Sequence, residues 1–192
     1  MSVKVVEASS SVSGTAADIT WGQAGSVSVS LSPNDATGKV ELFDGATKLG
    51  EGNLSGGATA IAIAAKALAV GDHALTLTYA GDGSHTASQV GVAVKVLKAP
   101  TTVSAPDVTV QWAKASSVSV TVTPALGGTV ELYDGSTKLG EAILGGDGKA
   151  RITLAAKSLE VGTHALTLKY LGSSNYLPSQ STVTVTVTKG RS

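Results

Sequence analysis

A stretch of seventeen residues occurs twice in this chain, and this repeat limits the possible folds more than any other feature. GKVELFDGATKLGEGNL spans residues 38–54 and GTVELYDGSTKLGEAIL spans residues 128–144, with twelve identical positions. Two more pairs of segments match at an offset of 91 residues: WGQAGSVSVSLSP with WAKASSVSVTVTP, and GDHALTLTYAG with GTHALTLKYLG. This offset is the size of one small domain. The 192 residues therefore predict two domains of one fold, over residues 1–98 and 99–192, with the boundary near Pro100.

Both copies show the period-two alternation of β-strands that have one buried face. Apolar residues occupy alternate positions in segments 27–31, 40–42, 61–63, 75–79 and 92–96, and in segments 118–122, 130–132, 152–154, 166–170 and 183–187. Two shorter strands, around residues 12–19 and 47–52, bring the first copy to about seven, which is typical of an antiparallel β-sandwich. Residues 58–68 are also a helix candidate. We predict a strand there, because Ala62 aligns with the polar Thr153.

The composition excludes several classes of partner and site. Lys and Arg number 14, as do Asp and Glu, so the formal net charge is zero and the chain lacks the basic surface that nucleic acid or an anionic membrane attracts. Cysteine is absent, which excludes disulfides and thiolate metal ligands. No apolar segment approaches the ~20 residues of a membrane-spanning helix. We expect neither a cofactor nor a metal ion.

The repeated seventeen residues predict a β-hairpin in each copy. Asp44-Gly45 in the first copy and Asp134-Gly135 in the second lie between two alternating stretches. Glycine adopts the positive φ of a tight turn at little cost, and Asp can bond the backbone of such a turn. A feature present in both copies indicates scaffolding, because chemistry would tend to occur once.

Three motifs together resemble the bacterial Ig-like repeat family. They are G-[KT]-V-E-L-[FY]-D-G-x-T-K-L-G-E, then L-x-V-G-x-H-A-L-T-L-x-Y-x-G, then Ser-Gln before a strand rich in Val and Thr. The resemblance covers nearly the whole chain, twice, and implies two tandem immunoglobulin-like antiparallel β-sandwiches. Members of this family recur in secreted and surface-anchored bacterial proteins, mostly as stalks, spacers and adhesive arms. The motifs are specific for the fold and not for a function, because one sandwich hosts many unrelated roles.

His73 and His164 are the candidates for a structural corner. Each ends a Leu-x-x-Gly-x-His segment, the place where many sandwiches carry a corner tyrosine. We expect each ring to hydrogen-bond a loop carbonyl, as a tyrosine hydroxyl would. A metal or catalytic role is the alternative, but neither copy offers a second ligand at a shared spacing.

Asp82 and His85 have no chemical counterparts in the second copy, where Ser173 and Tyr176 align with them. A calcium site at Asp82 would require several more oxygen ligands. We therefore predict an ordinary turn around Asp82 and place His85 on the surface.

Phe43 and Tyr133 have the opposite parity to the core residues beside them, which makes them candidates for an exposed contact. Glu41 and Glu131, each near the Asp of its hairpin turn, suggest an acid pair for glycoside hydrolysis. That reaction needs two carboxylates across a cleft, and an exposed hairpin offers none. We predict that the chain is not an enzyme.

Two functions from different classes remain. The leading hypothesis is a structural spacer that displays other domains of a larger secreted or cell-surface bacterial protein, because the two copies are alike in strands and turns. The alternative is an adhesive module that contacts a surface glycan or protein. We expect a monomer, extracellular and cell-wall associated, whose partners are neighbouring repeats of the same polypeptide. Residues 3–7 resemble residues 94–98, and we interpret them as the tail of a preceding repeat.

Overall fold

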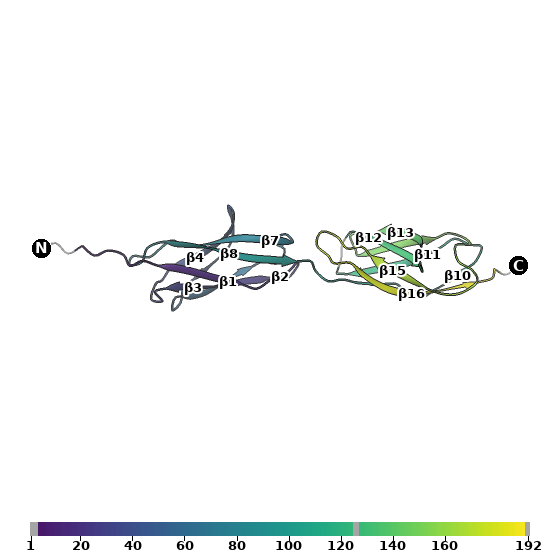
Figure 1. The fold of residues 1–192 in the computed structure, drawn as a ribbon, viewed down its shortest axis with the longest axis horizontal. Coiled ribbons are helices and arrows are strands. Elements are labelled where there is room, and N and C mark those ends of the chain that lie inside the picture. The colour runs from purple at the N-terminus through teal and green to yellow at the C-terminus, as the bar shows by residue number, and fades with distance from the viewer. Residues whose placement is uncertain (1–3, 125–126, 191–192) are drawn as a thin grey trace. The chain divides into compact units, whose positions relative to one another are not determined.

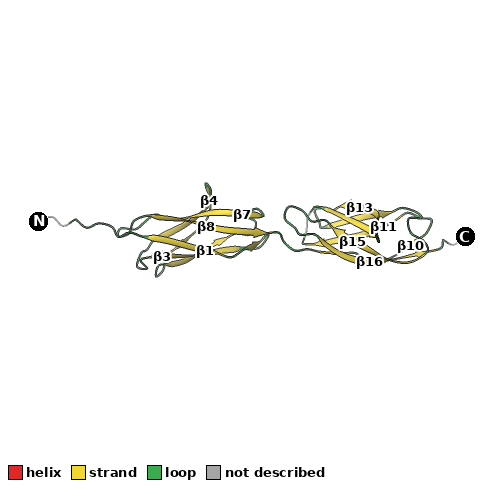
Figure 2. Ribbon diagram, in the orientation of Figure 1, coloured by secondary structure: helices red, strands yellow, loops and turns green. Residues whose placement is uncertain are grey.

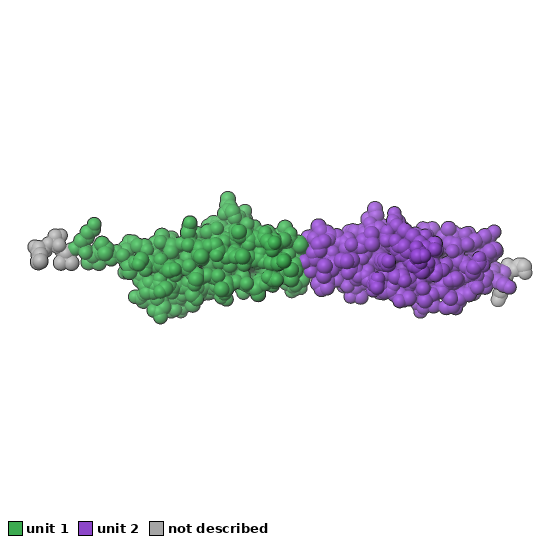
Figure 3. Space-filling model, viewed as in Figure 1, with its two compact units in different colours: residues 1–97 green, residues 98–192 purple. Residues whose placement is uncertain are grey.

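The structure is a computed structural model that describes residues 4–124 and 127–190. Strands, turns and loops account for the described residues, and none of these residues is helical (Figure 2). The chain divides into two compact units, residues 1–97 and 98–192, which Figure 3 colours separately. We call them unit 1 and unit 2. The predicted all-β fold is confirmed.

Unit 1 is a sandwich of two sheets (Figure 1). The three-stranded sheet has the order β1 (Ser11–Ala16), β3 (Gly25–Ser32), β6 (Ala58–Ile63). The five-stranded sheet has the order β2 (Ile19–Thr20), β8 (Ser88–Leu97), β7 (Gly71–Tyr79), β4 (Lys39–Asp44), β5 (Thr47–Asn53). β2 runs parallel to β8, and the other strand ladders of the unit are antiparallel.

Unit 2 repeats this arrangement strand for strand. Its three-stranded sheet has the order β14 (Lys149–Leu154), β11 (Ser116–Thr123), β9 (Thr102–Ser104). Its five-stranded sheet has the order β10 (Val108–Gln111), β16 (Ser179–Thr188), β15 (Gly162–Tyr170), β12 (Thr129–Asp134), β13 (Thr137–Ile143). β10 is the parallel neighbour of β16.

The first predicted strand divides between the two sheets, so the described residues of each unit form eight strands rather than about seven. In unit 1, β1 forms six residue pairs with β3, and the chain then crosses to form two pairs between β2 and β8. In unit 2, β9 forms three pairs with β11, and β10 forms four with β16. Pro106 follows β9, and a proline has no N–H to donate to a ladder. The crossing therefore comes earlier in unit 2.

The alternating apolar residues form the core of each unit, as predicted. Leu77 has no exposed surface, nor has its counterpart Leu168, and the last residues of β7 and β15, Tyr79 and Tyr170, are buried as well. Burying a leucine side chain stabilises a fold by about 1.5–3 kcal/mol. The strand predicted over residues 58–68 is confirmed only in its first half. β6 ends at Ile63, and a turn follows that contains Lys66 at a positive φ of 64°.

Candidate functional site

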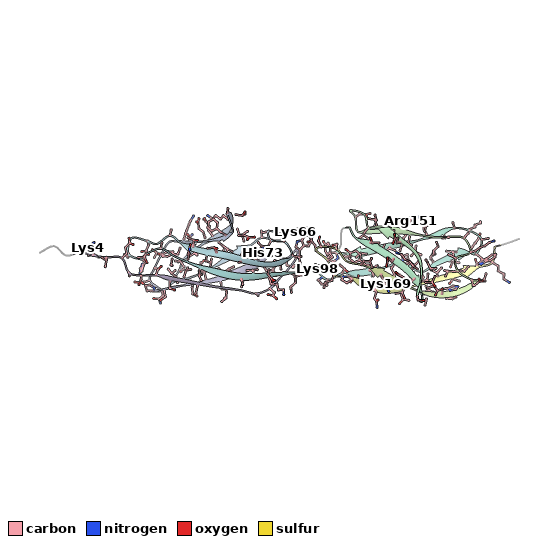
Figure 4. The ribbon with its side chains drawn as sticks, turned by 45° about the horizontal axis from the view of Figure 1, so that its top comes forward. Lys4, Lys66, His73, Lys98, Arg151 and Lys169 are labelled. Carbon is pink, nitrogen blue, oxygen red and sulfur yellow. The ribbon has the colours of Figure 1, made fainter. Side chains whose placement is uncertain are left out.

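The hairpin turn and the histidine corner lie together in unit 1. Asp44 and Thr47 pair across a two-residue turn that begins with Gly45 at φ 56°. The Asp44 carboxylate lies 3.2 Å from Nδ1 of His73, whose Nε2 lies 2.9 Å from the carbonyl oxygen of Ala69. His73 is labelled in Figure 4. One ring thus connects the hairpin turn to the loop that precedes β7.

The same arrangement occurs in unit 2. Nε2 of His164 lies 2.8 Å from the carbonyl oxygen of Glu160, and its Nδ1 lies 3.5 Å from the Asp134 carboxylate. Gly135, with φ 57°, begins the turn. A ring nitrogen must carry a proton to donate to a carbonyl, and only the imidazolium form donates at both nitrogens. Both acceptors belong to the scaffold, so this geometry ties loops together and leaves no ring nitrogen for a substrate.

The glutamates proposed as partners of an acid pair are engaged by lysines on the outward face of the hairpin. In unit 1, Lys48 forms ion pairs with Glu41 and Glu51. Hydrogen bonds from Lys39 and Lys48 lower the pKa of Glu51 to about 2. Glu51 was not a candidate acid; of the candidates, Glu131 has its pKa lowered by the bond from Lys138, which is opposite to the raised pKa that a general acid in glycoside hydrolysis needs.

In unit 2, Lys138 forms ion pairs with Glu131 and Glu141. The hydrogen bonds that Lys138 donates to these two glutamates raise the pKa of Lys138, and the bond to Glu131 lowers the pKa of that carboxyl group. Both groups are therefore held in their charged forms at neutral pH, and the ammonium group of Lys138 lies between the two carboxylates.

The two candidate contact aromatics, Phe43 and Tyr133, are half-buried at equivalent positions of β4 and β12. The Tyr133 hydroxyl donates to the Glu131 carboxylate at 2.9 Å, and this bond raises the pKa of Tyr133. The ammonium group of Lys169 lies 4.7 Å from the centre of the Tyr133 ring. Unit 1 has Thr78 in place of Lys169, so the two aromatic faces differ in their surroundings.

The prediction that His85 lies on the surface is wrong. His85 is only 6% exposed, and its Nδ1 lies 3.0 Å from an oxygen of Asp82. Its other ring nitrogen lies 3.4 Å from Asp35, in the loop between β3 and β4. The two loops at this end of unit 1 fold over the ring, and this burial depends on contacts between distant segments. Tyr176 is buried at the same place in unit 2.

Asp82 is the centre of this loop structure: it organises the turn that was predicted around it, and it also binds the segment at Thr37, which was not predicted. Its carboxylate accepts hydrogen bonds from the backbone N–H groups of Thr37, Ser84 and His85. The bonds from Thr37 and Ser84 make the largest contributions in lowering the pKa of Asp82. The Asp-Gly-Ser sequence of this loop was a signal for such a turn. That sequence did not indicate that Asp82 would also bind the backbone of Thr37.

Two further contacts recur in both units. Tyr79 donates to the carbonyl of Thr37 at 2.8 Å, and Tyr170 donates to that of Gly127 at 3.1 Å. A lysine also lies over each tryptophan ring, at 5.3 Å for Lys66 over Trp21 and at 5.0 Å for Lys157 over Trp112. These contacts join loops to the sandwich, so the tyrosine hydroxyls and the lysine ammonium groups are engaged within the scaffold.

The described residues offer neither a metal centre nor a membrane span. No three His, Cys, Asp or Glu side chains among residues 4–124 and 127–190 are grouped so that they could hold a metal ion. The same part of the chain has no long apolar helix of the kind that crosses a membrane.

Comparison with known proteins finds a match to one family model. The model of the family described as bacterial Ig-like domain (group 3) matches it twice, over residues 8–97 and 100–188. None of the curated proteins matches it.

Several solved structures are similar at low identity. The titin domains Z1Z2 in complex with telethonin align over 97% of this chain and 100% of that chain, with 15% identity and a TM-score of 0.47. Fibronectin(III)-like modules of CbhA from Clostridium thermocellum align over 93% of this chain and 95% of that chain, with 16% identity and a TM-score of 0.38. These scores are low, so the assignment of the fold rests on the family match and on the strand order.

Proposed function

Because the chain belongs to the bacterial Ig-like domain (group 3) family, we propose that it is a structural spacer within a larger secreted or cell-surface bacterial protein. Such domains commonly occur in extracellular proteins. In this role the two sandwiches separate or display other domains of the same polypeptide, and they carry out no chemistry of their own.

One observation carries this proposal: the polar contacts that recur in both units all join one part of the scaffold to another. The histidine corner, the Lys–Glu pairs of the hairpin and the buried tyrosine hydroxyl each have a counterpart. A catalytic site would need a nucleophile or base directed into a cleft, where a substrate is held. Repetition of scaffold contacts is what selection for folding alone produces.

A domain replacement in the parent protein tests the spacer role. Two unrelated β-sandwich domains of similar length replace residues 8–188, and a second variant lacks these residues altogether. We expect the replacement to retain the surface exposure of the flanking domains, measured with an antibody to each, and the deletion to reduce it. Loss of function in the replacement, with normal exposure of the flanking domains, would contradict the spacer role.

Adhesion is the second candidate, and the half-exposed pair Phe43 and Tyr133 is the observation that favours it. Aromatic side chains supply much of the energy at binding surfaces. Binding of the whole chain to an array of bacterial and host glycans tests this role, with Phe43→Ala and Tyr133→Ala as variants. Binding that falls in both variants at unchanged melting temperature would favour adhesion over the spacer role.

A further inference from the structure

Unit 2 exposes apolar side chains at positions where unit 1 has polar or small ones. Ile143 is 80% exposed at the end of the edge strand β13, and Leu171 is 51% exposed directly after β15. Asn53 and Ala80 occupy these positions in unit 1. Since the two units share their strand order and core, the sandwich itself does not require the exposed Ile and Leu.

The strand register places these side chains in one row on the outward face of the five-stranded sheet of unit 2. Thr129 pairs with Ile143 across the β12–β13 ladder. The N–H of Leu171 donates to the carbonyl of Thr129, which brings β15 beside β12 at the same level. Pro178 is opposite Leu171 when the β15–β16 register is continued by one residue. The row therefore crosses the sheet from its edge at β13 to β16.

A hollow of about 280 Å³ lies on the same face, between the end of β15 and the start of β16. Its lining consists of two rows of residues from these strands and the loop between them: Lys169, Tyr170, Leu171, Pro178, Ser179 and Gln180. Neighbouring strands are ~4.8 Å apart, so the hollow lies roughly 12 Å from Ile143 along the row. One face thus combines a protruding apolar side chain with a recess lined largely by apolar surface.

The charges beside this row are neutralised within the face. Lys138 is paired with Glu131 and Glu141, and Lys169 lies over the Tyr133 ring (Figure 4 labels Lys169). The whole chain has a formal charge of zero. A neutral face attracts neither a polyanion nor a polycation, and a net charge near zero favours self-association. Two identical faces of this kind can approach without repulsion.

We propose that this face of unit 2 binds the same face of a second copy of the chain. Ile143 of each copy enters the hollow of the other, because in a two-fold contact a residue and its partner position exchange roles. The row and the hollow comprise only a few residues, whereas a stable complex buries ~800 Å² per partner, so we expect the contact to be weak. The chain is then a monomer in dilute solution and pairs where copies are crowded, as on a surface that displays many of them.

Sedimentation velocity of the whole chain, from about 10 µM to about 1 mM, tests this proposal. We expect the weight-average mass to rise from that of a monomer towards that of a dimer. Ile143→Asn and Leu171→Ala, which install the residues of unit 1, should each weaken association at least about tenfold. Val161→Thr is the control, because Val161 is exposed in unit 2 but precedes β15 at its opposite end. It should associate like the unaltered chain.

Directed cross-linking tests the geometry, because the chain has no cysteine of its own that could form a competing disulfide. A mixture of Ile143→Cys and Pro178→Cys chains should form a disulfide-linked dimer at high concentration, whereas each variant alone should not. Disulfides require Cα atoms within about 7 Å, so only the exchanged contact allows this pattern.

Three results would overturn the proposal: a monomeric mass at the highest concentration, association that survives both apolar substitutions, or equal cross-linking in the single-variant samples. Binding of a glycan or a foreign protein to this face without self-association would also overturn it. The spacer role does not depend on this contact and would stand after any of these results.

Discussion

His73→Ala removes two contacts, and the structure sets the size of the effect. The hydrogen bond of the ring to the Ala69 carbonyl, 2.9 Å long, contributes about 0.5–1.5 kcal/mol. The contact with the Asp44 carboxylate is partly exposed to solvent and contributes less than about 1 kcal/mol. We expect unit 1 to lose about 1–2 kcal/mol of unfolding free energy, and its melting temperature to fall by about 4–8 °C for each kcal/mol.

Tryptophan fluorescence during urea unfolding measures this loss, because each unit has one tryptophan. In a Trp112→Phe background, the signal of Trp21 reports on unit 1 alone. His73→Gln is the matched control, since its amide N–H can still donate to the carbonyl and should restore part of the stability. His164→Ala should act similarly on unit 2.

An unchanged urea midpoint in His73→Ala would refute the structural account of the corner. So would a variant that unfolds normally but has lost affinity for a metal ion or another ligand, because the ring would then serve binding rather than stability.

Three other predictions concern unit 1. Asp82→Asn removes a carboxylate whose pKa is lowered by folding. The charged carboxylate therefore stabilises the fold above its ordinary pKa of 3.8, and this stabilisation is lost as the pH falls below that value. The difference in melting temperature between Asp82→Asn and the unaltered chain should narrow between about pH 7 and about pH 2. Tyr79→Phe should cost about 1 kcal/mol in urea unfolding, because the bond to the Thr37 carbonyl is lost. Gly14→Val should cost about 1–3 kcal/mol in thermal unfolding, since a Cβ at Gly14 would lie 2.3 Å from Cδ1 of Leu77.

Unit 2 supplies the matched controls for these three changes. Ser173 replaces Asp82, so Ser173→Ala should show no comparable pH dependence. Tyr170→Phe should destabilise unit 2 much as Tyr79→Phe destabilises unit 1. Ala105 occupies the position of Gly14, and Ala105→Gly should change stability little. A pH-independent effect of Asp82→Asn, or a neutral Gly14→Val, would contradict the contacts on which these expectations rest.

The fold was predictable because its signals are local. Alternation of apolar and polar residues assigns each strand a buried face without reference to its neighbours, and the buried set, including Leu77 and Tyr79, follows it. The split of the first strand was not predicted, although the buried residues Val12 and Ile19 stand at positions of opposite parity, as expected when the chain crosses from one sheet to the other. Pro106 was a signal for the early crossing in unit 2, since it cannot donate to a ladder.

The side-chain sites were less predictable, because they depend on which segments meet. The burial of His85 depends on Asp35, fifty residues earlier in the chain. The row that contains Ile143 and Leu171 appears only when the register of β12, β13 and β15 is known. Spacing along the chain does not give that register, because turns and bulges shift it.

The parallel ladder between the second and last strands of each unit has a mechanical consequence. The chain passes through β1 or β9 in the three-stranded sheet before it reaches β2 or β10, and it leaves the unit on β8 or β16, so a pull on both ends loads the β2–β8 or β10–β16 ladder in shear. In shear the hydrogen bonds of a ladder are strained together, not one after another. The ladder has two residue pairs in unit 1 and four in unit 2. Under tension, the ladder that bears the load is therefore shorter in unit 1 than in unit 2, although the cores of the two units are nearly the same.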